Sequence, residues 1–293
     1  MADIFTPIIG ILISTIVIGS IYSLVSTSLS LLWSTVGLPN FAHGALIVTG
    51  AYISWYLATI TGIPFAIFLM IPIIFAFGLF CDRVLFKRIR YEPNAVLRLF
   101  LITITLAVVI QQLFNIVFSG FPRHIPRLIE GSAEFGGFTV PYENLLVVVF
   151  AVVTLVALYV ILSKTVTGLA IRALGQSMQE SLVVGVNVEL VYSITVAIGF
   201  VLAGVAGMLL GSLYLFNAAY GDSQLFIGYL IAVFGGLGNI KGTIYGAYTI
   251  AAIQGMTTLF IGGAWTIAVP FLAMIIILII RPYGLFGVKE EVK

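Results

Sequence analysis

The sequence has few charged residues, and this scarcity excludes most classes of soluble protein. Of its 293 residues, 8% are charged and 61% are hydrophobic, whereas soluble domains are about 25% charged and about 45–50% apolar. Thirteen basic residues stand against eleven acidic ones, for a net charge of +2, which is too balanced for a polyanionic partner. We therefore exclude a water-soluble globule, a disordered chain and a nucleic-acid binder.

The sequence has a single cysteine and lacks the common phosphate-binding loop of nucleotide-binding proteins. The single cysteine, Cys81, excludes a disulfide framework and a cysteine-based zinc site. There is no Gly-x-x-x-x-Gly-Lys-Ser/Thr loop, and the glycine-rich run 235–243 has a different spacing and interrupts an apolar segment. Only two histidines are present, far apart and without acid-base or metal-ligand partners nearby. We expect no catalytic site, no metal and no cofactor.

Long apolar runs fill most of the chain, and a helix that crosses a bilayer needs about 20 such residues. They predict an all-α polytopic membrane protein, a single domain over residues 1–293, with eight or nine transmembrane segments and broken or re-entrant helices. The first run, Ile8–Trp33, is too long for the core of a signal peptide. The other runs cover residues 45–60, 65–81, 99–119, 144–162, 190–216, 225–234, 244–261 and 265–280.

The basic residues predict the orientation, because cytoplasmic loops are enriched in Lys and Arg. If loop 82–98 is cytoplasmic, loop 163–189, Lys241 and the tail are cytoplasmic as well. Eleven of the thirteen basic residues then lie inside, and Arg123 and Arg127 lie outside. The carboxyl terminus is expected in the cytoplasm. Nine spans and an external amino terminus follow if the region after the first run crosses fully, and eight spans and an internal amino terminus if it is re-entrant.

Ionisable residues are missing from all the predicted spans. Proton-coupled carriers usually need such a residue in the membrane, and His43 is the only candidate. Sodium coupling stays open, since carbonyl groups of broken helices can hold that ion. These features favour a pathway that is powered by other subunits. A stand-alone channel or secondary carrier is the alternative, and it predicts uptake by this chain alone.

The stretch 164–189 predicts two short helices on the cytoplasmic side. Ser177-Met-Gln-Glu180 fits a capping box at the start of the second helix. Gly185 is placed to end that helix and Asn187 to cap the next span, while an earlier helix covers about 168–174. Two such helices would form a rigid knob that transmits a displacement by a partner protein to the membrane helices. An ordinary interfacial connector is the other interpretation.

This stretch resembles the cytoplasmic loop of branched-chain amino acid ABC transporter permeases of the LivH type, in the LivH/LivM family. The matching residues are Thr165, Gly168, Ala170, Arg172, Ala173 and Val184–Asn187. Further similar stretches follow the family in order: Gly37 with Asn40–Gly44, Ala203–Gly211, Gly235–Gly246 and Arg281–Gly287. One departure is Leu169, where an arginine is common in the family.

The resemblance implies a permease subunit of an ATP-driven importer in the cell (inner or plasma) membrane. Its partners would be a second permease subunit of the LivM type, two cytoplasmic ABC ATPase subunits and an external substrate-binding protein. In that scheme the stretch 164–189 supplies a cytoplasmic coupling helix, which would dock on an ATPase through Gly168, Arg172, Ala173, Ser177, Glu180 and Gly185. Arg172 has the plainer alternative of a cation that snorkels to the interface. Similar permeases carry branched-chain or other amino acids, or urea and short amides, and nothing in the spans separates these substrates.

Glycine ladders suggest close approaches between helices. Gly238, Gly242 and Gly246 recur every four residues, as do small residues over 199–211. Residues at this spacing share one helix face and allow a second backbone to approach. Both ladders could simply pack within the subunit, but we expect the one at 238–246 to line the pathway or a dimer seam.

The break at residues 37–44 is the other candidate for the pathway, through Asn40, His43 and Gly44. An unwound backbone exposes amide and carbonyl groups that only a cavity or protein interior can satisfy. Asn40 and His43 would either contact the passing substrate or hydrogen-bond the broken backbone itself. A faint similarity between 37–52 and 236–248, which both end in Gly-Ala-Tyr, suggests two structural repeats.

Overall fold

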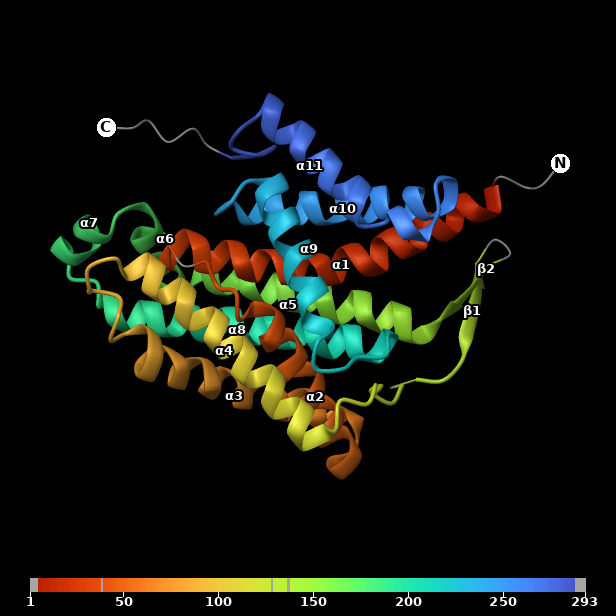
Figure 1. Cartoon of the computed structure of the whole chain (residues 1–293), viewed down its shortest axis with the longest axis horizontal. Helices are drawn as coiled ribbons and strands as arrows, with labels where there is room; N and C mark the ends of the chain where they lie inside the picture. Colours follow the sequence, from red (N-terminus) through yellow and green to blue (C-terminus); the bar gives the residue numbers. More distant parts are fainter. Residues whose placement is uncertain (1–4, 38, 128, 136–137, 288–293) are drawn as a thin grey trace.

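The computed structural model describes residues 5–37, 39–127, 129–135 and 138–287, and these residues are mostly helical (Figure 1). The helices are α1 (Phe5–Val36), α2 (His43–Thr61), α3 (Ile63–Cys81), the π-helical turn η1 (Asp82–Phe86), α4 (Ala95–Phe118), α5 (Tyr142–Lys164), α6 (Val166–Gln176), α7 (Met178–Val183), α8 (Val188–Leu213), α9 (Tyr220–Gly235), α10 (Ile240–Phe260), the short η2 (Gly263–Trp265) and α11 (Ala268–Ile280). Two strands, β1 (Ser132–Phe135) and β2 (Phe138–Pro141), form an antiparallel hairpin.

Seven helices in the described part of the chain are long and apolar enough to cross a membrane. Helices α9 and α10 meet at a bend of 118° and make an eighth candidate if they count as one broken span. The protein is therefore a polytopic, mainly helical membrane protein with a broken helix, as predicted. The count agrees with the predicted eight or nine only if the bent pair is included, which gives eight.

The candidate spans extend further than the predicted apolar runs, and the added turns at their ends contain ionisable residues. The span Phe65–Phe86 takes in Asp82, and Tyr142–Lys164 takes in Glu143. Both acidic side chains are buried. Asp82 is tolerated there because it pairs with Arg90 and accepts a hydrogen bond from Ser193.

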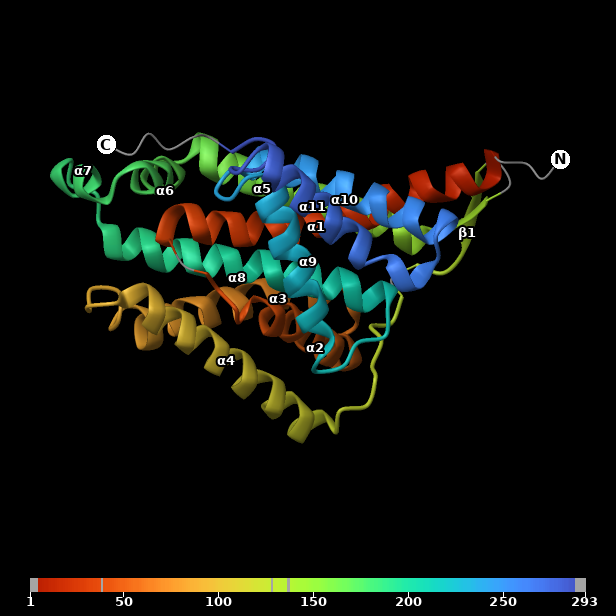
Figure 2. The same cartoon turned by 45° about the horizontal axis from the view of Figure 1, so that its top comes forward.

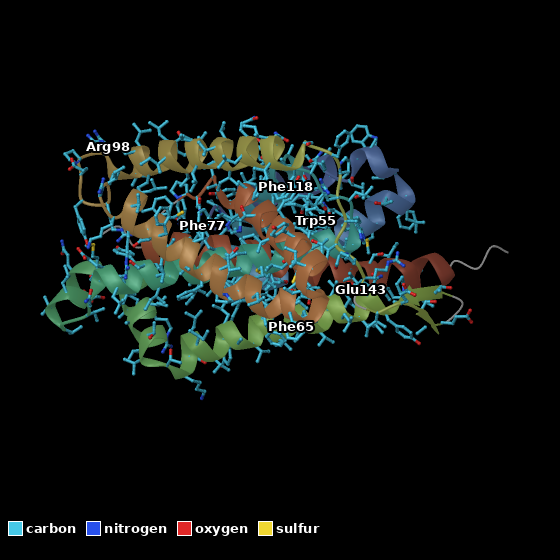
Figure 3. All side chains as sticks on the ribbon, turned by 90° about the horizontal axis from the view of Figure 1, so that it is seen from below. Trp55, Phe65, Phe77, Arg98, Phe118 and Glu143 are labelled. Atoms are coloured by element: carbon cyan, nitrogen blue, oxygen red, sulfur yellow. The ribbon has the colours of Figure 1, made fainter. Side chains whose placement is uncertain are left out.

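Helices α1, α5, α8 and α10 run along the horizontal axis of Figure 1. The segments at the two ends of the molecule differ in how many basic residues they carry. The short helices α6 and α7 lie at one end, while β1, β2 and the beginning of α1 lie at the other. Figure 3 shows Arg98 and Glu143 toward opposite ends. The turn after α9 lies at the α6–α7 end, because Gly238 and Gly175 both approach Ser34 at the end of α1. That end therefore groups the segments that carry Arg83, Lys87, Arg88, Arg90, Arg98, Lys164, Arg172, Lys241 and Arg281.

The chain contains two copies of one four-helix arrangement, α1–α4 and α8–α11, with α5–α7 between them. Helix α1 packs on α9 and α10, as α8 packs on α2 and α3. Helix α4 touches α2, and α11 touches α9. Helices α1 and α8 run in opposite directions between the two ends (Figures 1 and 2). The arrangement is an inverted repeat, a common plan for membrane transporters.

The similarity between 37–52 and 236–248 does not mark this repeat. The equivalent segments are Asn40–Gly44 before α2 and Asn217–Gly221 before α9, which both read Asn-x-Ala-x-Gly. In each copy the asparagine Oδ1 accepts a hydrogen bond from the amide two residues later, at 3.0 Å from Ala42 and at 3.1 Å from Ala219. Two matched asparagine turns therefore start the two equivalent helices.

Helix α8 lies at the centre of the core, with 83% of its most apolar window buried, against 11% for α4 and 6% for α11. An aromatic cluster joins the carboxyl-terminal end of α4 to α2. Tyr52 stacks on Phe114 at 4.5 Å between ring centroids, and Trp55 meets Phe118 edge-on at 5.7 Å (Figure 3). The serine-rich α1 is buried as well, because Ser20, Ser23 and other hydroxyls donate to carbonyls in its own preceding turn.

Candidate functional site

Helices α6 and α7 form a compact unit at one end of the molecule, called here the α6–α7 knob (residues 166–183). Each helix begins with a side-chain cap. Thr165 Oγ1 accepts a hydrogen bond from the Gly168 amide at 3.0 Å, and Ser177 Oγ accepts one from the Glu180 amide at 3.2 Å. The predicted serine cap is confirmed, and α6 extends about two residues beyond the predicted 168–174 at both ends.

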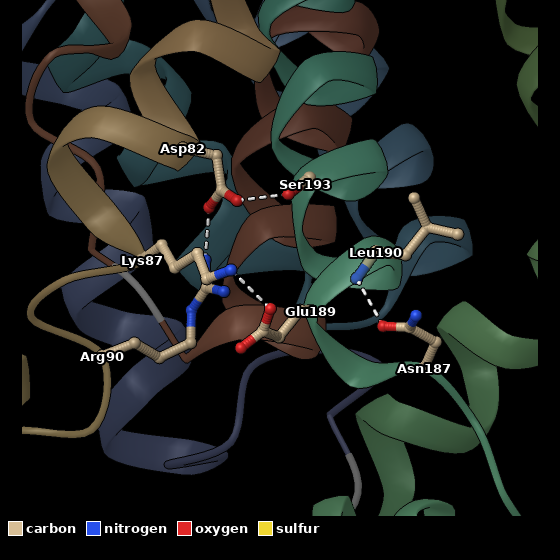
Figure 4. Close-up of polar contacts among 7 residues, drawn as sticks. All are labelled: Asp82, Lys87, Arg90, Asn187, Glu189, Leu190 and Ser193. Carbon is tan, nitrogen blue, oxygen red and sulfur yellow. Dashed lines mark hydrogen bonds and ion pairs between the residues drawn. The ribbon is translucent and has the colours of Figure 1, made fainter.

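Gly185 ends α7 as predicted, with φ +81°. The Gly185 amide donates to the Leu182 carbonyl at 3.1 Å, and the Val186 amide donates to the Ser181 carbonyl at 3.0 Å. This pair of bonds is a Schellman motif, which requires a left-handed residue at the position of Gly185. Asn187 then caps α8 by accepting from the Leu190 amide at 3.1 Å (Figure 4), so this cap is confirmed too.

The predicted coupling residues lie in two settings. Gly168 is buried, and a Cβ there would overlap the carbonyl of Ile161, so glycine lets α6 lie directly on α5. Ala173 and Ser177 are half-buried, whereas Arg172, Glu180 and Gly185 are exposed.

An exposed apolar tip accompanies the predicted coupling residues, and sequence analysis missed it. Val183 is 87% exposed and Val184 75% exposed, and Leu182 and Leu169 are also exposed. Valine and leucine carry no motif in a chain that is rich in both. Only the exposed position of Leu182, Val183 and Val184 at the end of α7 distinguishes this tip.

The second candidate region lies where α2 and α9 begin, and it is called here the α2–α9 crossing. A Cβ on Gly44 would overlap the carbonyl of Gly221, and a Cβ on Gly221 would overlap the carbonyl of Gly44. The first turns of the two helices therefore touch backbone to backbone. Residues 177 positions apart in sequence thus bring the two repeats into direct backbone contact.

Asn40 and His43 are completely covered at this crossing, with 1% and 0% of their surfaces exposed. Asn40 holds the turn before α2, while its Nδ2 has no hydrogen-bond partner among the described residues. His43 Nε2 lies 2.8 Å from Ser28 Oγ of α1, and its Nδ1 has no such partner either. Each side chain thus uses one polar atom for the local structure and leaves one unused.

The glycines at 238–246 lie in a different setting from the predicted single helix face. Gly238 precedes α10 and has φ +86°, so it belongs to the turn between α9 and α10. Gly242 packs against Gly235 of α9, and a Cβ on Gly246 would lie 3.3 Å from the Ile231 carbonyl oxygen. Each of these glycines thus has a close neighbour within the subunit. Their predicted place at the pathway or seam stays a prediction.

A cavity of about 880 Å³ opens among helices α1, α9 and α10 and strand β2, toward the end of the molecule that carries the hairpin. Its lining contains no charged side chain and combines apolar with neutral polar groups. Tyr22 donates a hydrogen bond to Gln254 Oε1 at 3.0 Å inside it. Burial raises the pKa of the Tyr214 phenol, which therefore stays neutral. The other polar lining residues are Ser14, Thr139, Asn144, Ser223, Thr258 and Thr266.

These features define a multi-pass membrane protein with an inverted repeat, a neutral cavity and a capped helical knob at one end. The part of the chain that the structure describes has no group of three or more His, Cys, Asp or Glu residues that could hold a metal.

The chain belongs to the family described as "branched-chain amino acid transport system / permease component", whose model matches residues 11–278. It is 26% identical over 298 residues to the high-affinity branched-chain amino acid transport system permease protein BraD of Pseudomonas aeruginosa, covering 96% of each chain. Identity to the LivH permease of the same kind of system from Escherichia coli K12 is 24%, over the full length of both chains. A probable LivH permease of Methanocaldococcus jannaschii is 27% identical, over 95% of this chain and 92% of its own. No solved structure matches.

Proposed function

We propose that the protein is the permease subunit of an ATP-binding cassette importer that carries branched-chain or related amino acids across the cell membrane. The match to the permease family over residues 11–278 carries this proposal. The α6–α7 knob supports it, since a rigidly capped element with an exposed apolar tip suits docking to another protein better than contact with water.

The subunit would act with a second permease of the LivM type, two cytoplasmic ATPase subunits and an external substrate-binding protein. We place the α6–α7 end in the cytoplasm, because the basic residues gather there. The carboxyl terminus is then cytoplasmic, and the beginning of α1 lies on the outer side. The ATPase would contact the knob through Arg172, Ser177, Glu180 and Gly185 and through its apolar tip.

The pathway would begin at the neutral cavity, which opens on the side where a binding protein delivers its substrate. An uncharged lining offers weak contacts to a small zwitterion and no deep electrostatic trap. Asn40, His43 and Gly44 would follow at the α2–α9 crossing, where the unused atoms Asn40 Nδ2 and His43 Nδ1 become available if the crossing opens. The glycines at 238–246 would line the pathway nearer the α6–α7 end.

The test is reconstitution of the tagged chain with its co-purified subunits in vesicles, with radiolabelled leucine or urea. The proposal expects leucine uptake that requires both ATP and the binding protein. Vesicles that contain this chain alone and concentrate a solute without nucleotide would support the carrier alternative and overturn the proposal. Uptake of urea but not of leucine would support the assignment as an importer and would identify urea, instead of a branched-chain amino acid, as its substrate.

The coupling assignment has a test of its own. Arg172→Glu and Gly185→Trp should abolish uptake and co-purification of the ATPase while the chain still inserts in the membrane. Lys241→Glu is the control, because it reverses another exposed charge at the same end. Normal ATPase co-purification with both coupling variants would remove the assignment.

A further inference from the structure

Asp82 brings a carboxylate into the protein interior where α3 continues as the π-helical turn η1. Its side chain is 0% exposed. It accepts a hydrogen bond from Ser193 Oγ of α8 at 2.5 Å and forms an ion pair with Arg90 (Figure 4). A buried carboxylate is costly unless it is paired and hydrogen-bonded, so these partners are needed for the helix to continue past Cys81. Such π-helical turns are frequent at functional sites.

Arg90 connects this carboxylate to a second element. Its guanidinium is buried and lies over the ring of Tyr192, with Cζ 4.1 Å from the ring centroid. The Tyr192 hydroxyl points at Met178 Sδ of α7, 3.8 Å away. The contacts thus run without interruption from α7 through Tyr192 and Arg90 to Asp82 at the end of α3.

Helices α3 and α8 have no free space between them next to this cluster. A Cβ at Gly78, one turn before Asp82, would lie 2.7 Å from the Cα of Ala197 on α8. A displacement of either helix end must therefore move the other helix or separate Asp82 from its partners. A tightly packed pair of this kind passes a displacement on instead of absorbing it.

We propose that Asp82 and Arg90 are positioning residues for transport. With Tyr192 and Ser193 they form a clamp, called here the Asp82 clamp, that transmits a displacement of α7 to the membrane helices α3 and α8. The inference rests on the proposed function, because it takes α7 to be the element that an ATPase moves. The clamp residues act through these helices and not by contact with the translocated molecule.

The same two segments supply a matched control. Lys87 and Glu189 also join the loop after α3 to the start of α8, at 2.6 Å, but their side chains are 45% and 49% exposed (Figure 4). Exposed ion pairs are screened by water and contribute little, whereas removal of one partner from a buried pair leaves a charge without compensation. Lys87→Ala and Glu189→Ala therefore delete a nearby ion pair without touching the clamp.

The first experiment measures the clamp independently of transport. Cys81 is the only cysteine of the chain and is 1% exposed beside Asp82, so its reaction with N-ethylmaleimide reports on the end of α3. We expect Arg90→Gln and Asp82→Asn to raise the labelling rate of this chain in membranes at least five-fold. Lys87→Ala should leave the rate within two-fold, and Cys81→Ser supplies the blank. Equal rates in the clamp and control variants would overturn the proposal.

The second experiment measures coupling in the assembled transporter, as substrate molecules imported per ATP hydrolysed. We expect the clamp variants to keep basal ATP hydrolysis within about two-fold and to lose at least ten-fold in this ratio. A purely structural role would lower uptake and hydrolysis together with the amount of complex. If Asp82→Asn does not accumulate, Tyr192→Leu keeps an apolar side chain and removes the link between Arg90 and α7, with the same expected loss.

The two proposals can fail separately. Wild-type vesicles without ATP-dependent uptake would overturn the proposed function, whatever the labelling of Cys81 shows. A wild-type transporter that works, with clamp variants that retain a normal ratio of transport to ATP hydrolysis, would overturn this inference and leave the proposed function intact.

Discussion

The α6–α7 knob and the α2–α9 crossing differ in how far apart in sequence their determining residues lie. The caps of the knob join residues three to five positions apart. The crossing joins Gly44 to Gly221. The knob is held by local hydrogen bonds that a reader of the sequence can find, whereas the crossing depends on two distant glycines meeting in the interior. The interior is therefore the less tolerant region, because another side chain can replace a local cap, whereas two backbones in contact leave no room for any side chain.

The largest effect should come from Gly221→Val, which tests the crossing directly. The added side chain overlaps the backbone of α2 at Gly44, where neither helix can move without separating the two repeats. Overpacking a core usually costs about 1–3 kcal/mol, and overlap with the backbone carbonyl of Gly44, which cannot rotate away, should exceed that range. We expect loss of the monodisperse protein in detergent chromatography. Gly263→Ala is the control, because nothing lies near that position, and equal behaviour of the two variants would contradict the close contact.

A smaller loss of stability is expected from substitutions in the two asparagine turns, and it should differ between the two turns. Asn40 is buried and Asn217 is only partly covered, although both hold equivalent turns. Asn40→Ala leaves a buried amide without its acceptor and should cost about 1–3 kcal/mol, while water can replace the side chain of Asn217. The melting temperature in detergent should therefore fall more for Asn40→Ala than for Asn217→Ala. Equal losses would show that burial does not distinguish the two repeats.

Gly185→Val should act on the knob and leave the membrane fold intact. A side chain at φ +81° costs about 1–2 kcal/mol, although there is open space around it. We expect a normal melting temperature but faster hydrogen exchange over 178–186. Asn tolerates the left-handed conformation, so Gly185→Asn should behave as the wild type. A lowered melting temperature for Gly185→Val would argue against a knob that folds locally.

The smallest effect should follow Ser177→Ala, which removes one cap of α7. Loss of such a cap costs about 1 kcal/mol, and a helix as short as α7 should fray at its first turn. Hydrogen exchange at the Glu180 amide should rise about five-fold, and Ser177→Asp should restore protection. An unchanged rate would mean that packing, and not the cap, holds α7 in place.

Much of the fold could be predicted because apolar runs and turn residues mark the helices directly. The predicted runs coincide with the long helices to within a few residues, and Ser177, Gly185 and Asn187 occupy the capping positions expected of them. The prediction failed where a partner came from elsewhere in the chain. The sequence predicts a loop at Asp82, because a charged residue normally ends an apolar run. Its burial is tolerable only through Arg90 and Ser193, and the local sequence does not show that these residues contact it. The repeat was placed at 236–248, because the match of Asn40–Gly44 with Asn217–Gly221 is too short to stand out.

The linear order of residues is enough to assign this chain to a bilayer, to locate most of its helix ends and to identify the short capped segment that forms the knob. Those properties depend on hydrophobicity and on hydrogen bonds between near neighbours. Three features follow from the three-dimensional packing: Gly44 meets Gly221, the Asp82 carboxylate at the end of α3 accepts a hydrogen bond from α8, and a neutral cavity opens beside α1. Each of these requires groups from distant segments to share one small space, and that coincidence is a property of packing and not of any local pattern.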